Sequence, residues 1–598
     1  MTPLRDIPGY LKVFQTYIGR RMYLVFALTL LAALAEGFGI VMLLPLLDGL
    51  AGAGGQPVSE ASRLLMGLLQ GLGLGGSTVT ILMVIGLAFL FKALIRLSSG
   101  AYSGYLQAQL MRELKARLFD AYSHMQYSYY AKRDTGHFIN VINAQIQGFY
   151  MAFSRFNGLF ANIIATTVYF GLAFFVAWRF GLMALVVGGV MLALFRWINS
   201  YVRDLSRSTS KENGVLAKLL IQSLQAFKYL AATGQFSHLR DGVLASIRRV
   251  SGYQVRHSVA ESFGGAIFEP VSIAFIIAIV IVQLEVLQQP LAPIMVSILL
   301  FHRGMGSVTN IQTSLVQALN LVGSVEMVRD EFAAQQRHRE PDGQKEIGPL
   351  SKGIELRGVS FAYAPELGQV LHEISLTIPA RSSVALVGES GAGKSTLVDL
   401  LCLLLRPTQG EIYIDGIPAN EIRLASWRRQ IGYVSQETVV FDDTLANNIC
   451  LWQGDIKKDP ALFERVSDAA RRAHIAHFIE ELPDGYQTLV GDRGMRLSGG
   501  QRQRLFIARE LFKQPNLLIL DEATSALDSQ SERYIQQSID ALKGQMTVVI
   551  IAHRLSTIRN VDQVFVFDKG RLVEQGAYEA LRQLEQSRLS KMVAMQAL

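Results

Sequence analysis

The chain has 598 residues, of which 50% are hydrophobic and 18% are charged, whereas soluble domains carry about 25% charged residues. This composition excludes a disordered protein, a fibrous protein and a protein that is soluble throughout. Cys402 and Cys450 alone provide no disulfide framework, and the net charge of +8 lies mostly in loops between apolar stretches, which indicates a membrane protein that binds no nucleic acid.

The first element expected is a helix at the N-terminus. Residues 7–18 repeat apolar side chains at helical spacing beside several Lys and Arg residues. Such a helix either lies on the inner surface of the membrane or packs against a helix bundle, and the sequence favours neither arrangement.

Six apolar stretches follow, at residues 22–47, 78–97, 156–178, 180–198, 262–284 and from 291 onward. Each approaches the roughly 20 residues that a spanning helix needs. Between residues 286 and 325 the only ionisable residues are His302 and Arg303. Because 40 helical residues extend about 60 Å, we expect the sixth helix to continue into the cytosol before the charged stretch 326–331.

The basic residues of the loops predict the orientation. Residues 98–155 hold six Lys and Arg residues and residues 199–262 hold nine, whereas residues 285–293 hold none. Cytoplasmic loops retain basic residues, so both long loops and both termini are expected in the cytosol. The spacing in residues 107–125 and 211–230 predicts helices within these loops. In the Gly-rich outer loop 51–77, a short interfacial helix is expected at Leu64, Leu65, Leu68 and Leu69.

Among the ionisable residues inside the apolar stretches, we single out Glu36, Glu269, His302 and Arg303. Ionisable groups inside a bilayer are costly, so they are candidates for the substrate path. At 1.5 Å per residue, Arg303 lies about 15 Å deep and both glutamates lie within several Å of that height. An ion pair between helices and direct contact with substrate therefore both remain open. Arginine suits the capture of phosphate, so an exposed Arg303 favours an anionic headgroup.

The soluble part begins after a stretch of Pro, Gly and charged residues. We place a transmembrane domain at residues 1–334, a linker at 335–352 and a nucleotide-binding domain at 353–598. An apolar strand at 383–387 leads into GESGAGKST at 388–396, and an apolar helix follows. This is the context that a P-loop requires. The expected ATP-binding residues are Gly388, Glu389, Ser390, Gly391, Ala392, Gly393, Lys394, Ser395 and Thr396.

The chemistry of phosphoryl transfer assigns further roles. Lys394 reaches the outer phosphates, and the hydroxyl of Ser395 is offered to Mg²⁺. Asp521, directly after the apolar run 517–520, is the expected acidic partner of that ion. Glu522 comes next, where a carboxylate can deprotonate the attacking water as a general base.

A further motif narrows the class of ATPase. LSGGQ occupies Leu497, Ser498, Gly499, Gly500 and Gln501, and LDEATSALD occupies residues 520–528. With the P-loop in this order, the chain resembles the ATP-binding cassette family, and over its whole length it resembles an exporter-type half-transporter. The resemblance implies an all-α six-helix transmembrane domain followed by an α/β P-loop ATPase cassette domain.

The resemblance also implies roles for single residues. Tyr363 corresponds to the aromatic residue that stacks on adenine, and Gln436 to the glutamine that touches Mg²⁺ and contacts the membrane domain. His553 corresponds to the catalytic histidine that senses the γ-phosphate, and Asp528 to the aspartate that communicates across the dimer. Short crosswise coupling helices are expected at 127–130 and 231–235; a departure from the family pattern is Gln145, where an aspartate is usual.

In this family each nucleotide lies between the P-loop of one cassette and the LSGGQ of another, so the resemblance implies two chains. A homodimer is expected and a heterodimer remains possible, with ATP and Mg²⁺ as cofactors. Residues 34–50 and 299–315 look like parts of bacterial lipid-linked oligosaccharide flippases. The resemblance therefore implies ATP-driven flipping of a lipid-linked glycan or similar anionic amphiphile in the bacterial inner membrane, in contact with membrane lipids. Export of drugs or peptides, and an ATP-gated channel or regulator, remain alternatives.

Overall fold

The computed structural model describes residues 7–50, 60–71, 73, 77–133, 135–176, 178, 201, 204–205, 208–209, 211–282, 285, 291–364, 366, 368–436, 438–491, 494–521, 533, 537, 540–552 and 555–596. Two compact units are present: Met1–Ser123 with Asp134–Arg337, and His124–Arg133 with His338–Leu598. The first is called the membrane unit below and the second the cassette unit. The boundary between them lies inside the predicted linker, so the first residues of 335–352 belong to the membrane unit and the rest to the cassette unit.

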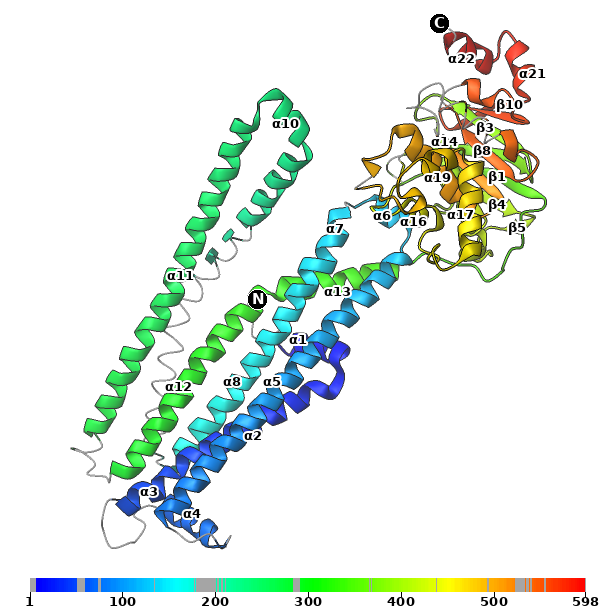
Figure 1. The fold of residues 1–598 in the computed structure, drawn as a ribbon. Helices are drawn as coiled ribbons and strands as arrows, with labels where there is room; N and C mark the ends of the chain where they lie inside the picture. The colour runs from blue at the N-terminus through cyan, green and yellow to red at the C-terminus, as the bar shows by residue number, and fades with distance from the viewer. Residues whose placement is uncertain are drawn as a thin grey trace. The chain divides into compact units, whose positions relative to one another are not determined.

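The membrane unit is helical (Figure 1). Its elements are α1 (Ile7–Ile18), the short η2 (Gly19–Arg21), α2 (Met22–Val41), α3 (Leu43–Leu50), α4 (Glu60–Gly71), α5 (Thr78–Ser123), α7 (Thr135–Asn140), the π-helix η3 (Val141–Gln145), α8 (Ile146–Val176), α10 (Phe227–Thr233), α11 (Phe236–Ile281), α12 (Leu291–Asn320) and α13 (Val322–Arg337). Helix α2 packs against α5 and α8, and α12 packs along α8.

Several of these helices are long and apolar enough to cross a membrane. Within the described residues these segments are Gly9–Asp48, Thr78–Ser123, Thr135–Val176 and Ile294–Ala318. They cover all or most of the first, second, third and sixth predicted stretches. The fifth stretch lies mostly in α11, and the fourth, at 180–198, lies outside the described residues.

The N-terminal helix α1 packs against the bundle, which is one of the two arrangements that its sequence allowed. Phe14 is fully buried, and its ring contacts the rings of Phe149, Phe153 and Phe156 of α8. Tyr10 also donates a hydrogen bond to Glu326 of α13. The apolar face of α1 is therefore covered by aromatic side chains of the protein.

Two further helices refine the predictions. The outer-loop helix α4 buries Leu65 and Leu69 against its neighbours, while Leu64 and Leu68 stay exposed, as expected of an interfacial helix. The sixth helix is not continuous to residue 325: α12 ends at Asn320 and α13 begins at Val322. The charged stretch 326–331 therefore lies within a helix.

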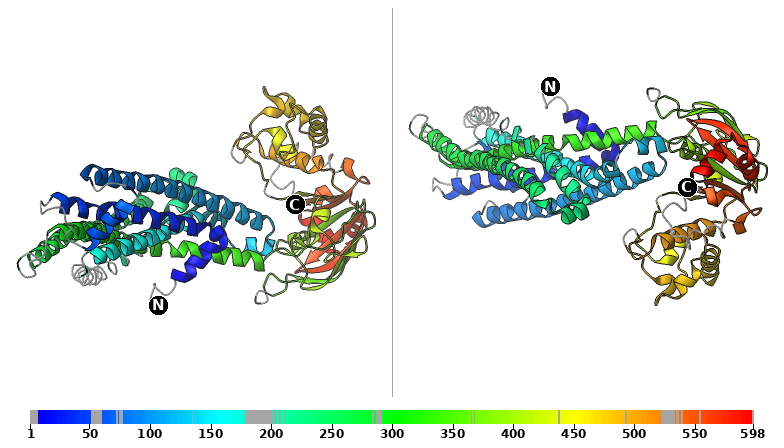
Figure 2. Two further views of the ribbon diagram at one scale, coloured as in Figure 1. Left: turned by 90° about the horizontal axis from the view of Figure 1, so that it is seen from below. Right: turned by 90° about the horizontal axis from the view of Figure 1, so that it is seen from above.

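The cassette unit contains two sheets (Figure 2). The first has the order β2-β1-β4-β5 and the second β10-β9-β3-β8-β7-β6. The strands are β1 (Gly353–Phe361), β2 (Leu371–Pro379), β3 (Ser383–Gly388), β4 (Gln409–Ile414), β5 (Ile417–Pro418), β6 (Ile431–Val434), β7 (Leu517–Asp521), β8 (Thr547–Ile551), β9 (Gln563–Asp568) and β10 (Arg571–Gly576). The first sheet is antiparallel, whereas β9, β3, β8, β7 and β6 of the second run parallel.

The second sheet is buried on both faces, as parallel sheets usually are. Successive residues of a strand point to opposite faces, and alternate residues of β7 accordingly join different hydrophobic clusters. Leu517 and Ile519 belong to the cluster that also contains the side chains of the P-loop helix. Leu518 and Leu520 belong to the cluster that contains the helices drawn in yellow and gold in Figure 2.

The helices of the cassette unit are α6 (Tyr127–Ala131), α14 (Lys394–Leu401), α15 (Leu424–Arg428), α16 (Leu445–Cys450), α17 (Pro460–Arg472), α18 (Ala476–Glu480), the short η6 (Gly485–Gln487), α19 (Gly499–Phe512), the short η8 (Leu555–Ile558), α21 (Tyr578–Gln583) and α22 (Arg588–Gln596). Cys402 and Cys450 are buried and free.

Candidate functional site

The topology of the second sheet brings the predicted nucleotide-binding segments to one edge. The P-loop follows β3, Asp521 ends β7, and Gln436 lies two residues after β6. These strands are parallel and lie in the order β3-β8-β7-β6. The carboxyl ends of parallel strands share one edge of a sheet, where open α/β folds bind ligands.

Glycines give the P-loop its conformation. Gly388, Gly391 and Gly393 have φ angles of 156°, 81° and 94°, which L-residues with a side chain rarely adopt. A Cβ atom at Gly388 would lie 2.3 Å from the carbonyl oxygen of Phe567, and one at Gly393 would lie 2.6 Å from Leu371. Only glycine fits these positions, so the loop presents backbone rather than side chains to a ligand.

The P-loop leads into a helix N-terminus suited to phosphate. Gly393 is the N-cap of α14, and Lys394 is its first residue. Backbone amides and the helix dipole favour an anion at such an end. Lys394 is buried, and its Nζ donates to the carbonyl oxygens of Gly388 at 2.8 Å and Glu389 at 2.9 Å. Its ammonium group therefore lies across the loop.

Tyr363 reaches the same helix from the first sheet. Its hydroxyl lies 3.1 Å from Oγ1 of Thr396, which is buried in α14. Its ring packs edge-on against Phe361 at the end of β1, yet 41% of the residue is exposed. The remaining face is open to an aromatic ligand, and the hydrogen bond fixes the ring beside the P-loop helix.

The acidic group at the end of β7 is also buried. Asp521 is 7% exposed; burial of Asp399, on α14, followed by the charge of Asp521, raises the pKa of Asp399 to about 6. Ser395 and Asp521 offer a hydroxyl and a carboxylate oxygen, the hard ligands that Mg²⁺ takes. These two residues, with the amide of Gln436, therefore form a donor set that fits Mg²⁺.

The LSGGQ segment forms a second helix N-terminus. Ser498 is the N-cap of α19, and a capping box joins it to Gln501: Ser498 Oγ accepts from the Gln501 amide at 3.2 Å, and Gln501 Oε1 accepts from the Ser498 amide at 2.7 Å. Leu497 and Gly500 are buried, whereas Gly499 is exposed. The end of α19 is thus held rigidly while its first turn stays open.

The first predicted coupling segment is helical, and the second is helical in part. The first, α6, belongs to the cassette unit, where Tyr127 packs against the hydrophobic cluster of the P-loop helix. Partial burial, followed by the charge of Asp399, raises the pKa of Tyr127. The second predicted segment, 231–235, overlaps only the end of α10 (Phe227–Thr233), because Gly234 ends this helix in the left-handed conformation at φ 67°.

A charge cluster joins four helices of the membrane unit, α2, α5, α8 and α12. Glu36 of α2 is 5% exposed; its Oε2 lies 2.8 Å from Nζ of Lys92 on α5 and accepts from the hydroxyl of Tyr169 on α8. Its Oε1 lies 3.5 Å from Nε of Arg303 on α12. An ion pair between helices, one of the two roles that the sequence left open, is present between Glu36 and Arg303, and the Arg303 side chain is still 54% exposed.

Lys92 was missing from the sequence analysis, although a lysine inside the second apolar stretch was a sufficient signal. His302 is exposed, and the side chain of Glu269 lies outside the described part of the chain. Glu522, Asp528 and His553 lie outside it as well. The roles of all predicted site residues therefore remain predictions.

Comparisons with known proteins agree with this geometry. Residues 22–306 match the family model of the ABC transporter transmembrane region, and residues 371–525 match that of the ABC transporter. The chain is 33% identical over 507 residues to the ATP-dependent lipid A-core flippase of Coxiella burnetii, covering 83% of this chain and 84% of that protein. It is 32% identical over 490 residues to the heterocyst differentiation ATP-binding protein HepA of Nostoc sp., covering 82% and 80%. Its fold is similar to the structure of a bacterial Atm1-family ABC exporter with ATP bound, at a TM-score of 0.76 and 25% identity over 98% of this chain and 99% of that one.

Proposed function

Since the chain belongs to the ABC transporter family, as an exporter half-transporter whose ATP hydrolysis drives transport, we propose that two copies flip an anionic, lipid-linked amphiphile across the bacterial inner membrane. The charge cluster around Glu36 is the observation that supports an anionic substrate. Lys92 and Arg303 supply two positive charges against the single negative charge of Glu36. A half-exposed guanidinium in this setting suits bidentate capture of phosphate.

The nucleotide chemistry follows from the residues at the edge of the second sheet. The P-loop amides and Lys394 bind the phosphates, and the exposed ring of Tyr363 stacks on the base. Ser395, Asp521 and Gln436 hold Mg²⁺, which neutralises charge on the phosphates when bound. Glu522 takes the proton of the attacking water, and His553 contacts the γ-phosphate.

The need for two copies follows from the inventory of one chain. One chain has one P-loop and one LSGGQ segment, and each nucleotide is held between the P-loop of one copy and the α19 N-terminus of the other. Both segments match the family motif, so the two sites of a homodimer are equivalent and active. Asp528 links the two sites.

The transport cycle is alternating access. ATP closes the two cassettes, the coupling helices α6 and α10 pass the movement to the membrane helices, and hydrolysis resets the transporter. The outward direction is supported by the similarity to exporters and flippases. The same relatives, at 32–34% identity, support a lipid-linked substrate and the bacterial inner membrane.

Translocation in proteoliposomes tests the proposal. The protein is reconstituted with a fluorescent anionic glycolipid, and ATP-dependent loss of the label from one leaflet is followed. Arg303→Ala is expected to lower the rate about tenfold while ATPase activity in the absence of the glycolipid stays intact, since a charge-assisted contact is worth about this factor. Arg63→Ala, which removes an exposed positive charge from α4, is the control.

Unchanged translocation by Arg303→Ala would leave Arg303 with a structural role in the ion pair. Stimulation of the ATPase by a broad set of uncharged compounds would favour a drug exporter instead. Ion conductance without matching hydrolysis would favour a channel.

A further inference from the structure

Glu340 lies where two connections to the membrane unit meet the cassette unit. The chain enters the cassette unit at His124, after α5, and again at His338, after α13. The two entering segments pair with each other: the amide of Gln126 donates to the carbonyl of His338 at 2.9 Å, and the amide of Glu340 donates to the carbonyl of His124 at 2.8 Å. The rings of Tyr129 and His338 also stack, with centroids 4.7 Å apart.

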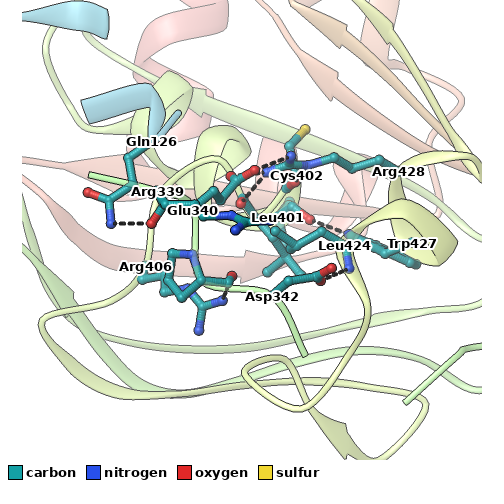
Figure 3. A network of polar contacts seen from close by, with 12 residues as sticks. Gln126, Arg339, Glu340, Asp342, Leu401, Cys402, Arg406, Leu424, Trp427 and Arg428 are labelled. Atoms are coloured by element: carbon teal, nitrogen blue, oxygen red, sulfur yellow. Dashed lines mark hydrogen bonds and ion pairs between the residues drawn. The ribbon is translucent and has the colours of Figure 1, made fainter. Parts of the chain in front are cut away.

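The side chain of Glu340 points towards Arg428 of α15 (Figure 3). Its carboxylate accepts two hydrogen bonds from Arg428, at 2.5 Å and 2.7 Å. Arg428 also donates to the carbonyl of Leu403 at 2.8 Å, and the neighbouring Trp427 donates to the carbonyl of Leu401 at 2.9 Å. Two consecutive residues of α15 thus satisfy carbonyls at the end of α14 that have no partner within that helix.

Helix α14 connects this contact to the P-loop. It begins at Lys394 and ends at Leu401, and apart from Ser395 and Asp399 its side chains are buried. Its eight residues extend about 12 Å. A movement of the P-loop on binding or losing phosphate therefore displaces the Leu401 and Leu403 carbonyls together with Arg428.

We propose that the Arg428–Glu340 pair makes the linker a second coupling element, which transmits the position of the P-loop helix to both entering segments. Glu340 joins the segment after α5 to α15, because its amide donates to that segment and its carboxylate accepts from Arg428. Glu340 and Arg428 are positioning residues, since neither belongs to the nucleotide-binding set.

A neighbouring ion pair provides a matched control. Arg423 Nη1 and Glu346 Oε1 also join the linker to the start of α15, at 2.7 Å. Their side chains are 52% and 71% exposed, compared with 31% and 17% for Arg428 and Glu340. Arg423 and Glu346 also lie outside the pairing with residues 124–126. Exposed pairs contribute little, so Glu346→Gln removes an equal charge without breaking the proposed path.

Spin-label distances measure the coupling without any transported substrate, so the result does not depend on the substrate proposed above. Both native cysteines are buried, and Leu64→Cys places a single accessible label on the exposed face of α4. The distance between the labels of two copies is measured in the full-length protein without nucleotide and after trapping with MgATP and vanadate. The Michaelis constant for ATP and the thermal unfolding temperature are measured on the same samples.

After trapping, Glu340→Gln is expected to lower about tenfold the ratio of molecules at the trapped label–label distance to molecules at the resting distance. This is the effect of losing a charge-assisted hydrogen-bond pair. The KM for ATP stays within about twofold, because the P-loop is unchanged. Arg428→Lys keeps the positive charge but loses the planar guanidinium that donates two hydrogen bonds to the carboxylate, so it gives an intermediate ratio. Glu346→Gln gives the same ratio as the unsubstituted protein. An unchanged ratio in Glu340→Gln would overturn the proposal, and so would an equal loss in Glu340→Gln and Glu346→Gln.

Discussion

The charge cluster of the membrane unit can be separated into its structural and functional parts by replacing Lys92. The Glu36 and Lys92 side chains are only 7% and 17% exposed, and their charged atoms lie 2.8 Å apart. Removing one partner of a buried pair costs about 3–5 kcal/mol, because the other charge is left unpaired. In Lys92→Met, Glu36 keeps the Tyr169 hydroxyl and Arg303 at 3.5 Å, so we expect a smaller loss of stability, about 2 kcal/mol.

A second substitution then distinguishes the two roles. Adding Glu36→Gln to Lys92→Met removes the unpaired carboxylate, and most of the lost stability should return. If Lys92 serves only the ion pair, translocation returns with it. If its charge attracts an anionic headgroup, translocation stays about tenfold slower, although the protein is stable.

The assay combines thermal unfolding in detergent with glycolipid translocation in proteoliposomes, on both single variants and on the double variant. Arg112→Met, which removes an exposed charge from the same helix α5, is the control. A double variant that translocates at the unsubstituted rate would refute the reasoning, since the positive charge would then have no use beyond pairing with Glu36.

Three further predictions concern the cassette unit. Glu522→Gln is expected to bind ATP and hold the cassettes closed without turnover; near-normal phosphate release would contradict its role as the general base. Ser498→Ala should lower the unfolding free energy by about 1 kcal/mol through loss of the N-cap and should also abolish ATPase activity; Thr444→Ala, which removes the N-cap of α16, is the control and should lose only stability. Asp415→Asn should destabilise the cassette at neutral pH. Partial burial raises the pKa of Asp415, but the backbone amides of the chain before β1 outweigh it and leave the pKa below its usual value. The difference from the unsubstituted protein should therefore be full above pH 5 and shrink as the pH falls below about 4; a difference that persists at low pH would exclude ionisation as its cause.

The nucleotide site was predictable because its chemistry is local. Glycines at positions 388, 391 and 393 meet backbone requirements that no other residue satisfies, so their spacing between an apolar strand and an apolar helix indicated the P-loop. Spanning helices are likewise read from composition over about 20 residues. The end of α10 was set by Gly234, which the prediction of 231–235 did not treat as a helix stop.

The partners of buried charges were not predictable in the same way. Glu340 and Arg509 carry no motif, and charged residues are by default exposed. Arg509 of α19 is 3% exposed and donates to Asn448 and Val439, in segments about 60 to 70 positions earlier in the chain. Such contacts depend on how distant segments pack, which one sequence does not show.

These contacts give both nucleotide-facing helices of a cassette the same construction. Helix α14 has its N-terminus at the P-loop, and its far end is held by Arg428; helix α19 has its N-terminus at LSGGQ, and Arg509 holds it to Asn448. The apolar side chains of α14 and α19 belong to different hydrophobic clusters on opposite faces of one sheet. Because close-packed interiors have low compressibility and transmit strain, we expect each helix to move with its own cluster. In the proposed dimer, closure around a nucleotide between the P-loop of one copy and LSGGQ of the other would therefore act on two separately anchored helices. Of these, α14 ends at the contact that holds the linker, which is why Glu340 rather than a residue near α19 is the place to interrupt coupling.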